Sequence, residues 1–253
     1  MKTALIGHTG FVGSNIALQT KFDDYYNSQN ISQIYGKKYD LIVSCATSSL
    51  FWKANIEPEA DWLAIKKLMS DLSNVEAKNF VLISTIFVYP NPYNVTEDTA
   101  INKSELTHYG LHRYKLEQFV KERFKKHLIV RLPNLFGQNL KKNFVFDLIH
   151  QNRWDLTHQN SKMQWYNLEN IWPDISIALS HDLSIINFSV APLSAKKIAK
   201  YTLNINFNTE TEKPPLNHRM LTKYGHIYGK KSLYLYSQTE TLEKLKKFIQ
   251  SHI

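Results

Sequence analysis

Hydrophobic and polar positions alternate along the chain between short apolar runs and amphipathic stretches. The runs "YDLIVSCA", "NFVLISTIFVYP" and "HLIVRLPN" are almost continuously apolar, which is typical of central parallel strands covered on both faces. Amphipathic segments such as "EPEADWLAIKKLMSDLSNV" and "ELTHYGLHRYKLEQFVKERF" separate these runs and predict helices. The order of strands and helices therefore predicts an α/β fold, in which a parallel sheet is doubly wound with helices on both faces.

The first residues, "MKTALIGHTGFVGSNI", predict a strand over 2–6 and a helix from Phe11 onward. Gly7, Gly10 and Gly13 occupy the junction with the spacing GxxGxxG, a variant of the dinucleotide-binding fingerprint. Glycine suits this turn because it has no Cβ, so that a phosphate can approach the amides at the start of the helix. We therefore favour a nucleotide-binding turn over a plain turn, and predict a Rossmann-type fold.

The alternation of strands and helices loosens beyond residue 138. We expect residues 1–138 to form a dinucleotide-binding core, to which residues 181–200 return. Residues 139–253 are expected to form mainly a small C-terminal substrate-binding region and a last helix.

Two polar stretches and one helix start complete the prediction of elements. Residues 91–103 are expected to form a loop, and residues 211–219 an exposed linker. The last helix is expected to begin at "SQTE", where Ser237 and Glu240 have the spacing of a capping box.

The composition is that of an ordinary globular protein, with 43% hydrophobic and 21% charged residues among 253. The single cysteine, Cys45, excludes an intrachain disulfide and fits a reducing compartment. No apolar run is long enough for a membrane span, and the N-terminal apolar stretch is too short for a signal peptide. We therefore expect a cytoplasmic protein with no membrane partner.

The formal net charge is +9, with 31 Lys and Arg against 22 Asp and Glu. This balance favours anionic partners, which are nucleotides, nucleotide-linked substrates or nucleic acid. The basic residues are scattered and form no stripe interleaved with aromatic residues, which disfavours nucleic acid. The ten histidines show no metal-ligand spacing, so no metal is expected.

Candidate chemistry lies in the middle of the chain. Ser84 and Thr85 end a predicted central strand, at the sheet edge where ligands bind in open α/β folds. Tyr109 and Arg113 are four residues apart on a predicted helix and share a face with Glu117. A phenol beside a fixed cation has a lowered pKa and can exchange a proton, and a hydroxyl can hold the substrate oxygen. This pattern suits hydride transfer at a carbinol carbon with a nicotinamide cofactor.

These motifs resemble the extended short-chain dehydrogenase/reductase family, in its branch of epimerases, dehydratases and reductases that act on nucleotide sugars. The resemblance covers most of the chain and rests on "GHTGFVG", "YDLIVSCAT", "STIFVY", "YGLHR", "VRLPNLFG" and "IINFSVAPLSAKKIA". It implies an NAD(P)-dependent oxidoreductase or epimerase that acts on a carbinol or keto carbon of a nucleotide-linked sugar. It also suggests bacterial surface-polysaccharide biosynthesis as the setting, and a homodimer formed through the helices over 57–75 and 105–124.

The resemblance assigns roles to individual residues. The catalytic residues are Tyr109 as general acid or base, Thr85 as its hydroxyl partner and Arg113 as the ribose-binding cation. The cofactor is expected to contact Gly7, Thr9, Gly10, Phe11, Val12, Gly13, Asn27, Ser28, Cys45, Ala46, Thr47, Tyr109, Arg113, Leu132 and Asn134. The substrate is expected to contact Thr85, Ile86, Asn134, Lys142, Asn143 and Trp165.

The sequence departs from the family pattern at the catalytic cation. The family's lysine is Arg113 here, which is always charged but does not release a proton. We favour retained catalysis, because Tyr109 and Thr85 are both present. The alternative is a non-catalytic NAD(P)-binding sensor or scaffold of the same fold. Ile86 and Phe87 replace the Asp-Glu pair of the dehydratases, which argues against dehydration.

Cofactor and substrate specificity depend on a few neutral positions. Asn27 and Ser28 stand where an acidic residue favours NAD, so NADP is slightly favoured, although both residues equally suit a turn. Gln164 and its neighbours replace an arginine that binds the substrate diphosphate in relatives. Trp165 suits stacking on a base, but core packing is the better interpretation.

Overall fold

A six-stranded sheet forms the centre of the computed structural model, which describes all residues from 1 to 253. Its strand order is β10-β6-β4-β3-β1-β2, and β1 pairs in parallel with both β2 and β3, as β3 does with β4. The strands are β1 (Thr3–Ile6), β2 (Asp24–Tyr26), β3 (Lys38–Ser44), β4 (Glu76–Thr85), β6 (His127–Leu132) and β10 (Ile185–Asn187). The α/β fold with a parallel, Rossmann-type sheet is therefore confirmed.

The chain divides into two compact units. Unit 1 comprises Met1–Pro90, Thr99–Arg131 and Ile171–Ile186, and unit 2 comprises Asn91–Asp98, Leu132–Asn170 and Asn187–Ile253. The expected division into a dinucleotide-binding core of residues 1–138, to which residues 181–200 return, and a substrate-binding region of residues 139–253 stays a prediction.

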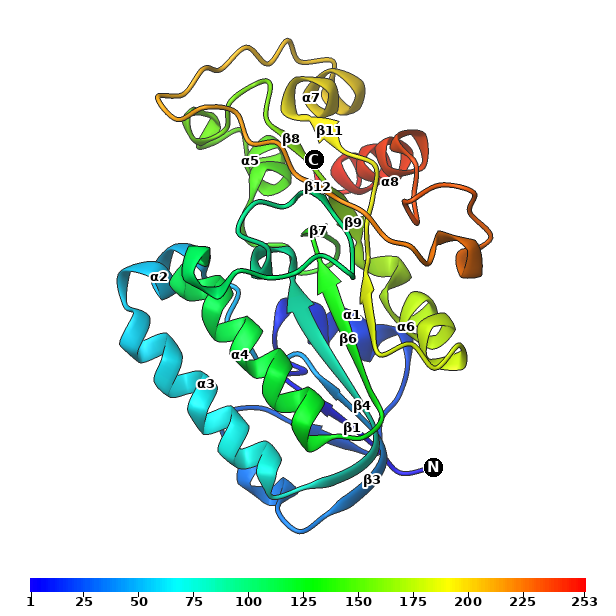
Figure 1. Ribbon diagram of the computed structural model, residues 1–253. Helices are drawn as coiled ribbons and strands as arrows, with labels where there is room; N and C mark the ends of the chain where they lie inside the picture. Colours follow the sequence, from blue (N-terminus) through cyan, green and yellow to red (C-terminus); the bar gives the residue numbers. More distant parts are fainter. The chain divides into compact units, whose positions relative to one another are not determined.

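Helices cover both faces of the sheet in unit 1. α3 and α4 lie side by side on the face that Figure 1 turns to the viewer, and α1 packs against α6. The apolar strand residues expected from the sequence form the core between them, with Ile42, Phe80 and Ile129 fully buried. The helices are α1 (Phe11–Gln19), α2 (Phe51–Ile56), α3 (Pro58–Ser73), α4 (His108–Arg123) and α6 (Ile171–Ser180).

Unit 2 is built from three helices and three two-stranded sheets around a second core, which includes Phe136, Trp165 and Leu245. The expected capping box is confirmed, because Ser237 and Glu240 exchange side-chain and backbone hydrogen bonds at the start of the last helix. The helices are α5 (Phe144–His150), α7 (Ala195–Leu203) and α8 (Gln238–Gln250). The strands are β5 (Tyr93–Val95), β7 (Asn134–Phe136), β8 (Lys162–Met163), β9 (Trp165–Asn167), β11 (Leu193–Ser194) and β12 (Arg219–Met220).

Two expectations about irregular segments are wrong in part. The expected loop 91–103 contains β5, and the expected linker 211–219 runs into β12, which pairs with β5 in parallel. Main-chain hydrogen bonds join them, from Arg219 N to Pro92 O at 2.7 Å and from Leu221 N to Val95 O at 2.8 Å. Strands of two or three residues carry no readable hydrophobic alternation, so the sequence pattern did not show them.

The strand expected over 79–90 is also shorter at its end. β4 stops at Thr85, and a 3₁₀ turn follows over Ile86–Val88. The Thr85 hydroxyl causes this change, because it accepts a hydrogen bond from the Phe87 amide and so caps the turn. Other 3₁₀ turns span Ile31–Ile34, Lys103–Glu105, Trp154–Leu156, Leu168–Asn170 and Gly225–Tyr228.

A buried ion pair joins α4 to β6. Arg131 donates from Nε and Nη2 to the two carboxylate oxygens of Glu117, at 3.0 and 2.7 Å, and both side chains are at most 2% exposed. Ser84 and Tyr89 complete the network, with Ser84 donating to Glu117 at 2.6 Å and Arg131 donating to the Tyr89 hydroxyl at 2.7 Å. This ion pair sets the orientation of α4 relative to the sheet, and so determines which face of α4 points at the end of β4.

Candidate active site

In the glycine turn, the backbone after β1 packs closely against the backbone after β3 and against the start of α1. Gly7 has φ +82°, and a Cβ on it would lie 2.7 Å from the carbonyl of Cys45. A Cβ on Gly13 would lie 2.2 Å from Gly7 O, so α1 packs directly on the turn only because residue 13 is glycine. Gly10 caps α1 without any side-chain hydrogen bond, and the first turn of the helix holds no acidic residue. The bare helix start fits the phosphates of a dinucleotide.

This packing makes a prediction for Gly13→Ala. The new Cβ forces α1 away from β1, so we expect NADPH binding, measured by nicotinamide fluorescence, to be lost. Gly36→Ala is the matched control: Gly36 has φ +70° but open space around it, so the change adds backbone strain of about 1–2 kcal/mol without a clash. Unchanged binding by the Gly13 variant would contradict the role given to the turn.

The other residues expected to hold the cofactor lie at the ends of β2 and β3. Cys45, Ala46 and Thr47 follow β3, and Cys45 N donates to Ile6 O at 2.8 Å beside the glycine turn. Burial raises the pKa of the Cys45 thiol, so the thiol stays protonated.

Asn27 and Ser28 lie directly after β2 in a turn. Asn27 N donates to Asn30 Oδ1 at 2.7 Å, and Asn27 Oδ1 accepts from Gln29 N at 2.8 Å. The interpretation as a turn is thus confirmed, whereas contact with the cofactor stays a prediction. Sequence reasoning missed His8, whose Nδ1 lies 3.0 Å from Tyr26 O within the glycine turn.

Tyr109 lies in the first turn of α4, close to the end of β4. Thr107 caps the helix, and a Cβ on Gly110 would lie 2.1 Å from Phe87 O, so glycine permits the close approach of α4 to the 3₁₀ turn. Tyr109 is 8% exposed, and the Thr85 hydroxyl lies close enough to its phenol to lower the pKa of Tyr109. The structure therefore brings together the two residues that the sequence placed 24 positions apart.

Arg113 lies under the Tyr109 ring and is held by a carboxylate. Its guanidinium carbon is 3.8 Å from the ring centroid. Nη1 donates to Asp61 Oδ2 at 2.5 Å, and Nη2 donates to Asp61 Oδ1 at 2.9 Å and to Ser48 O at 2.8 Å. The terminal nitrogens are thus engaged within the protein, while the buried Nε has no hydrogen-bond partner. Ribose binding by Arg113 stays a prediction.

The expected lowering of the Tyr109 pKa is wrong for the chain on its own. Burial raises the pKa of Tyr109, and the negative charge of Asp61 raises it further. The Arg113 charge and the Thr85 hydrogen bond lower the pKa but do not outweigh burial. The phenol therefore holds its proton at neutral pH.

The residues expected to contact substrate are distributed over both units. In unit 1, Ile86 is buried in the turn after β4. In unit 2, Asn134 opens β7, and Asn143 caps α5 by accepting from the Val145 and Phe146 amides at 3.0 and 3.3 Å. This capping role explains an asparagine at position 143 without any contact to a substrate. Leu132, expected at the cofactor, is a buried residue at the end of β6, and Lys142 is exposed.

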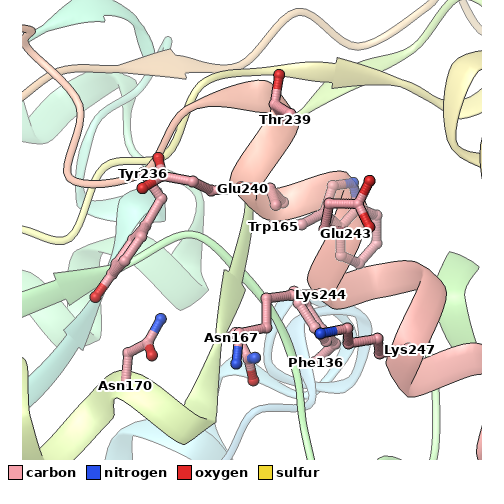
Figure 2. Close-up of a pocket in the computed structure, with 11 residues that line it drawn as sticks. Phe136, Trp165, Asn167, Asn170, Tyr236, Thr239, Glu240, Glu243, Lys244 and Lys247 are labelled. Carbon is pink, nitrogen blue, oxygen red and sulfur yellow. The ribbon is translucent and has the colours of Figure 1, made fainter.

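Trp165 is 1% exposed and belongs to the core of unit 2, as the core-packing interpretation expects. It also forms part of the wall of a cavity of about 380 Å³ beneath α8 (Figure 2). Figure 2 shows the polar side chains that line this cavity. Glu243, Lys244 and Lys247 come from α8, Asn167 from β9 and Asn170 from the 3₁₀ turn after β9.

Sequence reasoning missed a basic cavity of about 480 Å³ in unit 2. Lys162, Lys197 and Arg219 line it together with Tyr93 and Tyr234, and no Asp or Glu is among the lining residues. Arg219 Nε donates to the Tyr234 hydroxyl at 3.0 Å, and Lys197 Nζ to Gln238 Oε1 at 2.6 Å. Lys162 and Arg219 come from strands of two residues, so no pattern in the sequence indicated that they share a site.

Comparison with known proteins identifies the family. Residues 1–157 match the family model described as RmlD substrate binding domain. The chain belongs to this family. No curated protein matches the chain by sequence. None of the helices has the length and apolar character that crossing a bilayer requires.

Solved structures share the fold over its whole length. A dTDP-4-dehydrorhamnose reductase from Clostridium acetobutylicum is 17% identical, with a TM-score of 0.73 over 99% of both chains. The same enzyme from Bacillus anthracis, solved with NADP, is 20% identical, with a TM-score of 0.72 over 99% of both chains. A UDP-glucose 4-epimerase from Thermotoga maritima, solved with UDP-glucose, is 13% identical, with a TM-score of 0.73 over 99% of this chain and 98% of the epimerase. The resemblance to the extended short-chain dehydrogenase/reductase family is thereby confirmed.

Proposed function

We propose that the chain is an NAD(P)-dependent enzyme that transfers hydride at a carbinol or keto carbon of a nucleotide-linked sugar. The observation that carries the proposal is that the Tyr109 phenol and the Thr85 hydroxyl lie together at the carboxyl end of β4. Ligands of open parallel sheets bind at this edge. Membership in the RmlD substrate binding domain family and full-length similarity to reductases and epimerases support the same reaction class.

The glycine turn and the ends of β1 and β3 would hold the dinucleotide, and a bound nicotinamide would supply or accept the hydride. Tyr109 Oη gives a proton to the substrate oxygen, or takes one from it. Thr85 Oγ1 holds the same oxygen by a hydrogen bond. Phe51 and Phe87, with ring centroids 5.2 and 6.0 Å from that of Tyr109, pack beside the Tyr109 ring and hold its position. NADP fits slightly better than NAD, because no acidic residue follows β2 directly.

The basic cavity of unit 2 supports an anionic substrate, since Lys162 and Arg219 meet no lining carboxylate there. We expect Arg219→Ala to raise KM for a nucleotide sugar about 10- to 100-fold with little change in kcat, because a charge-assisted hydrogen bond contributes about 1.5–3 kcal/mol. Steady-state kinetics measure the effect. Lys244→Ala, in the other cavity of unit 2, is the matched control and should leave KM unchanged. Equal KM values for the Arg219 variant and the wild type would remove this cavity from the substrate site.

The test of the function is turnover. Purified chain is mixed with NADPH or NADH and a panel of UDP- and dTDP-linked 4-keto sugars, and the absorbance of the reduced cofactor is followed. Consumption of cofactor with one keto sugar supports the proposal. Tight cofactor binding without consumption across the panel favours the alternative, a sensor or scaffold of the same fold.

A cytoplasmic setting in bacterial surface-polysaccharide synthesis accords with this substrate class. A homodimer through the helices over 57–75 and 105–124 stays a prediction. Leu63 on α3 is 61% exposed and gives that surface apolar character.

A further inference from the structure

The chain carries an arginine where the family has a lysine, and a carboxylate from another helix accompanies it. Asp61 on α3 contacts Arg113 through both of its oxygens, and the two side chains are 8% and 2% exposed. A guanidinium matches a carboxylate in this two-bond geometry, whereas a lysine ammonium does not. The pairing orients the plane of Arg113 as well as balancing its charge.

Asp61 binds a second group of α4. Its Oδ2 lies 2.7 Å from His112 Nδ1, and both side chains are less than a tenth exposed. The charged or titratable groups near Tyr109 and Arg113 are Asp61 from α3 and His112 from α4, and the His108 ring on α4 lies 6.2 Å from that of His112. The other packed elements contribute uncharged side chains, which are Phe51 and Asn55 from α2, Thr85 from β4 and Phe87 from the 3₁₀ turn.

We propose that Asp61 is a positioning residue, which clamps the Arg113 guanidinium against the Tyr109 ring and balances its charge, so that Tyr109 enters each turnover with its proton in place. The proposal rests on the proposed function and deepens it. It makes the phenol a proton donor, so the substrate that reacts is the ketone.

A bound reduced nicotinamide would supply a hydride, with its electron pair, to the carbonyl carbon, and the C=O π pair would move to the oxygen. That oxygen takes the proton from Tyr109 Oη, whose O–H bond breaks. The products are the carbinol, the oxidised cofactor and the phenolate of Tyr109, which recovers a proton from water.

The electrostatics agree with this geometry. Burial raises the pKa of Tyr109 most, Arg113 lowers it, and Asp61 raises it by less than Arg113 lowers it. Burial raises the pKa of Asp61 itself, but hydrogen bonds from Arg113 and His112 outweigh burial and keep the carboxylate charged. Removal of the Asp61 charge leaves the Arg113 cation unopposed beside the phenol, and the pKa of Tyr109 then falls.

The test titrates the Tyr109 phenol directly. The full-length chain is labelled with ¹³Cζ-tyrosine, and the Tyr109 resonance is assigned by its absence in Tyr109→Phe. We expect the titration midpoint in Asp61→Asn to lie about one to three pH units below that of the wild type. Asp61→Glu, which keeps the charge, should remain close to the wild type. An Asp61→Asn midpoint equal to that of the wild type would overturn the proposal.

A second variant keeps the test decisive if Asp61→Asn does not fold. The double variant Asp61→Leu/Arg113→Met leaves no buried charge of this pair, and such replacements are often neutral for stability. Because Arg113 lowers the pKa of Tyr109 by more than Asp61 raises it, we expect the midpoint of the double variant to rise above that of the wild type, but by less than the midpoint of Arg113→Met alone. Equal rises in the double variant and in Arg113→Met mean that Asp61 does not offset the cation, and overturn the proposal.

The titration requires neither cofactor nor substrate, so its outcome is separable from that of the proposed function. In a turnover assay, the alkaline limb of kcat for ketone reduction should move to lower pH in Asp61→Asn, by the same shift as the titration. Shifted titration without any hydride transfer rejects the function and retains the electrostatic role of Asp61. Turnover with an unshifted titration rejects the role of Asp61 and retains the function.

Discussion

Tyr109→Phe is expected to lower ketone reduction by about a hundred- to ten-thousand-fold, which is the range that general acid catalysis contributes. The reason is that phenylalanine keeps the ring between Phe51 and Phe87 but removes the proton donor that Thr85 contacts. Binding of NADPH should remain intact, because the glycine turn lies on another element. Stopped-flow oxidation of NADPH with saturating keto sugar measures the loss.

A matched control lies on the same helix. Tyr114 is half-buried and contacts Lys103 rather than the catalytic pair, so Tyr114→Phe should keep nearly full activity. If Tyr109→Phe retains more than a tenth of the activity, proton transfer goes through another group. Thr85 and the rest of the site then need new roles.

Glu117→Ala is expected to destabilise the chain by about 3–5 kcal/mol, the range found when one partner of a buried ion pair is removed. Arg131 then loses two hydrogen bonds at 3.0 and 2.7 Å, and its guanidinium stays 2% exposed without its carboxylate. Urea unfolding followed by circular dichroism measures the change in the free energy of unfolding.

Two comparisons make this prediction specific. Glu76 forms an ion pair with Lys38 at the surface, where the side chains are 64% and 76% exposed, so Glu76→Ala should change stability by less than about 1 kcal/mol. Adding Arg131→Met to Glu117→Ala should recover part of the loss, because no unpaired buried charge remains. A loss below about 1 kcal/mol for Glu117→Ala alone would mean that water reaches Arg131 and that the pair does not anchor α4.

The sequence predicted those parts of the fold that have a local cause. Continuous apolar runs predicted β3, β4 and β6, because central parallel strands are buried on both faces. The glycine spacing predicted the turn after β1, since only glycine permits contacts of 2.2 Å to 2.7 Å at a Cβ position. Ser237 and Glu240 predicted the start of α8 for a similarly local reason.

The partners of buried charges have no local signal. Asp61 is 52 residues before Arg113, and nothing in the helix pattern of α3 distinguishes a carboxylate that binds an arginine from one at a helix start. Glu117 shares the helix face of Tyr109, yet its partner on β6 follows only from the packing of α4 on the sheet. The sequence did not predict the basic cavity for the same reason, because Lys162 and Arg219 are 57 residues apart.

If Tyr109 protonates a ketone while hydride from NAD(P)H reaches its carbon, the label of a deuterated cofactor must appear on that carbon. The most direct measurement incubates the chain with 4-deuterated NADPH and a dTDP- or UDP-linked 4-keto sugar, and locates deuterium in the product by mass spectrometry and NMR. We expect one deuterium on the new carbinol carbon with the wild type and a loss of at least about a hundredfold with Tyr109→Phe. Equal labelling by both proteins, or no labelling by a wild type that binds cofactor, would contradict this expectation.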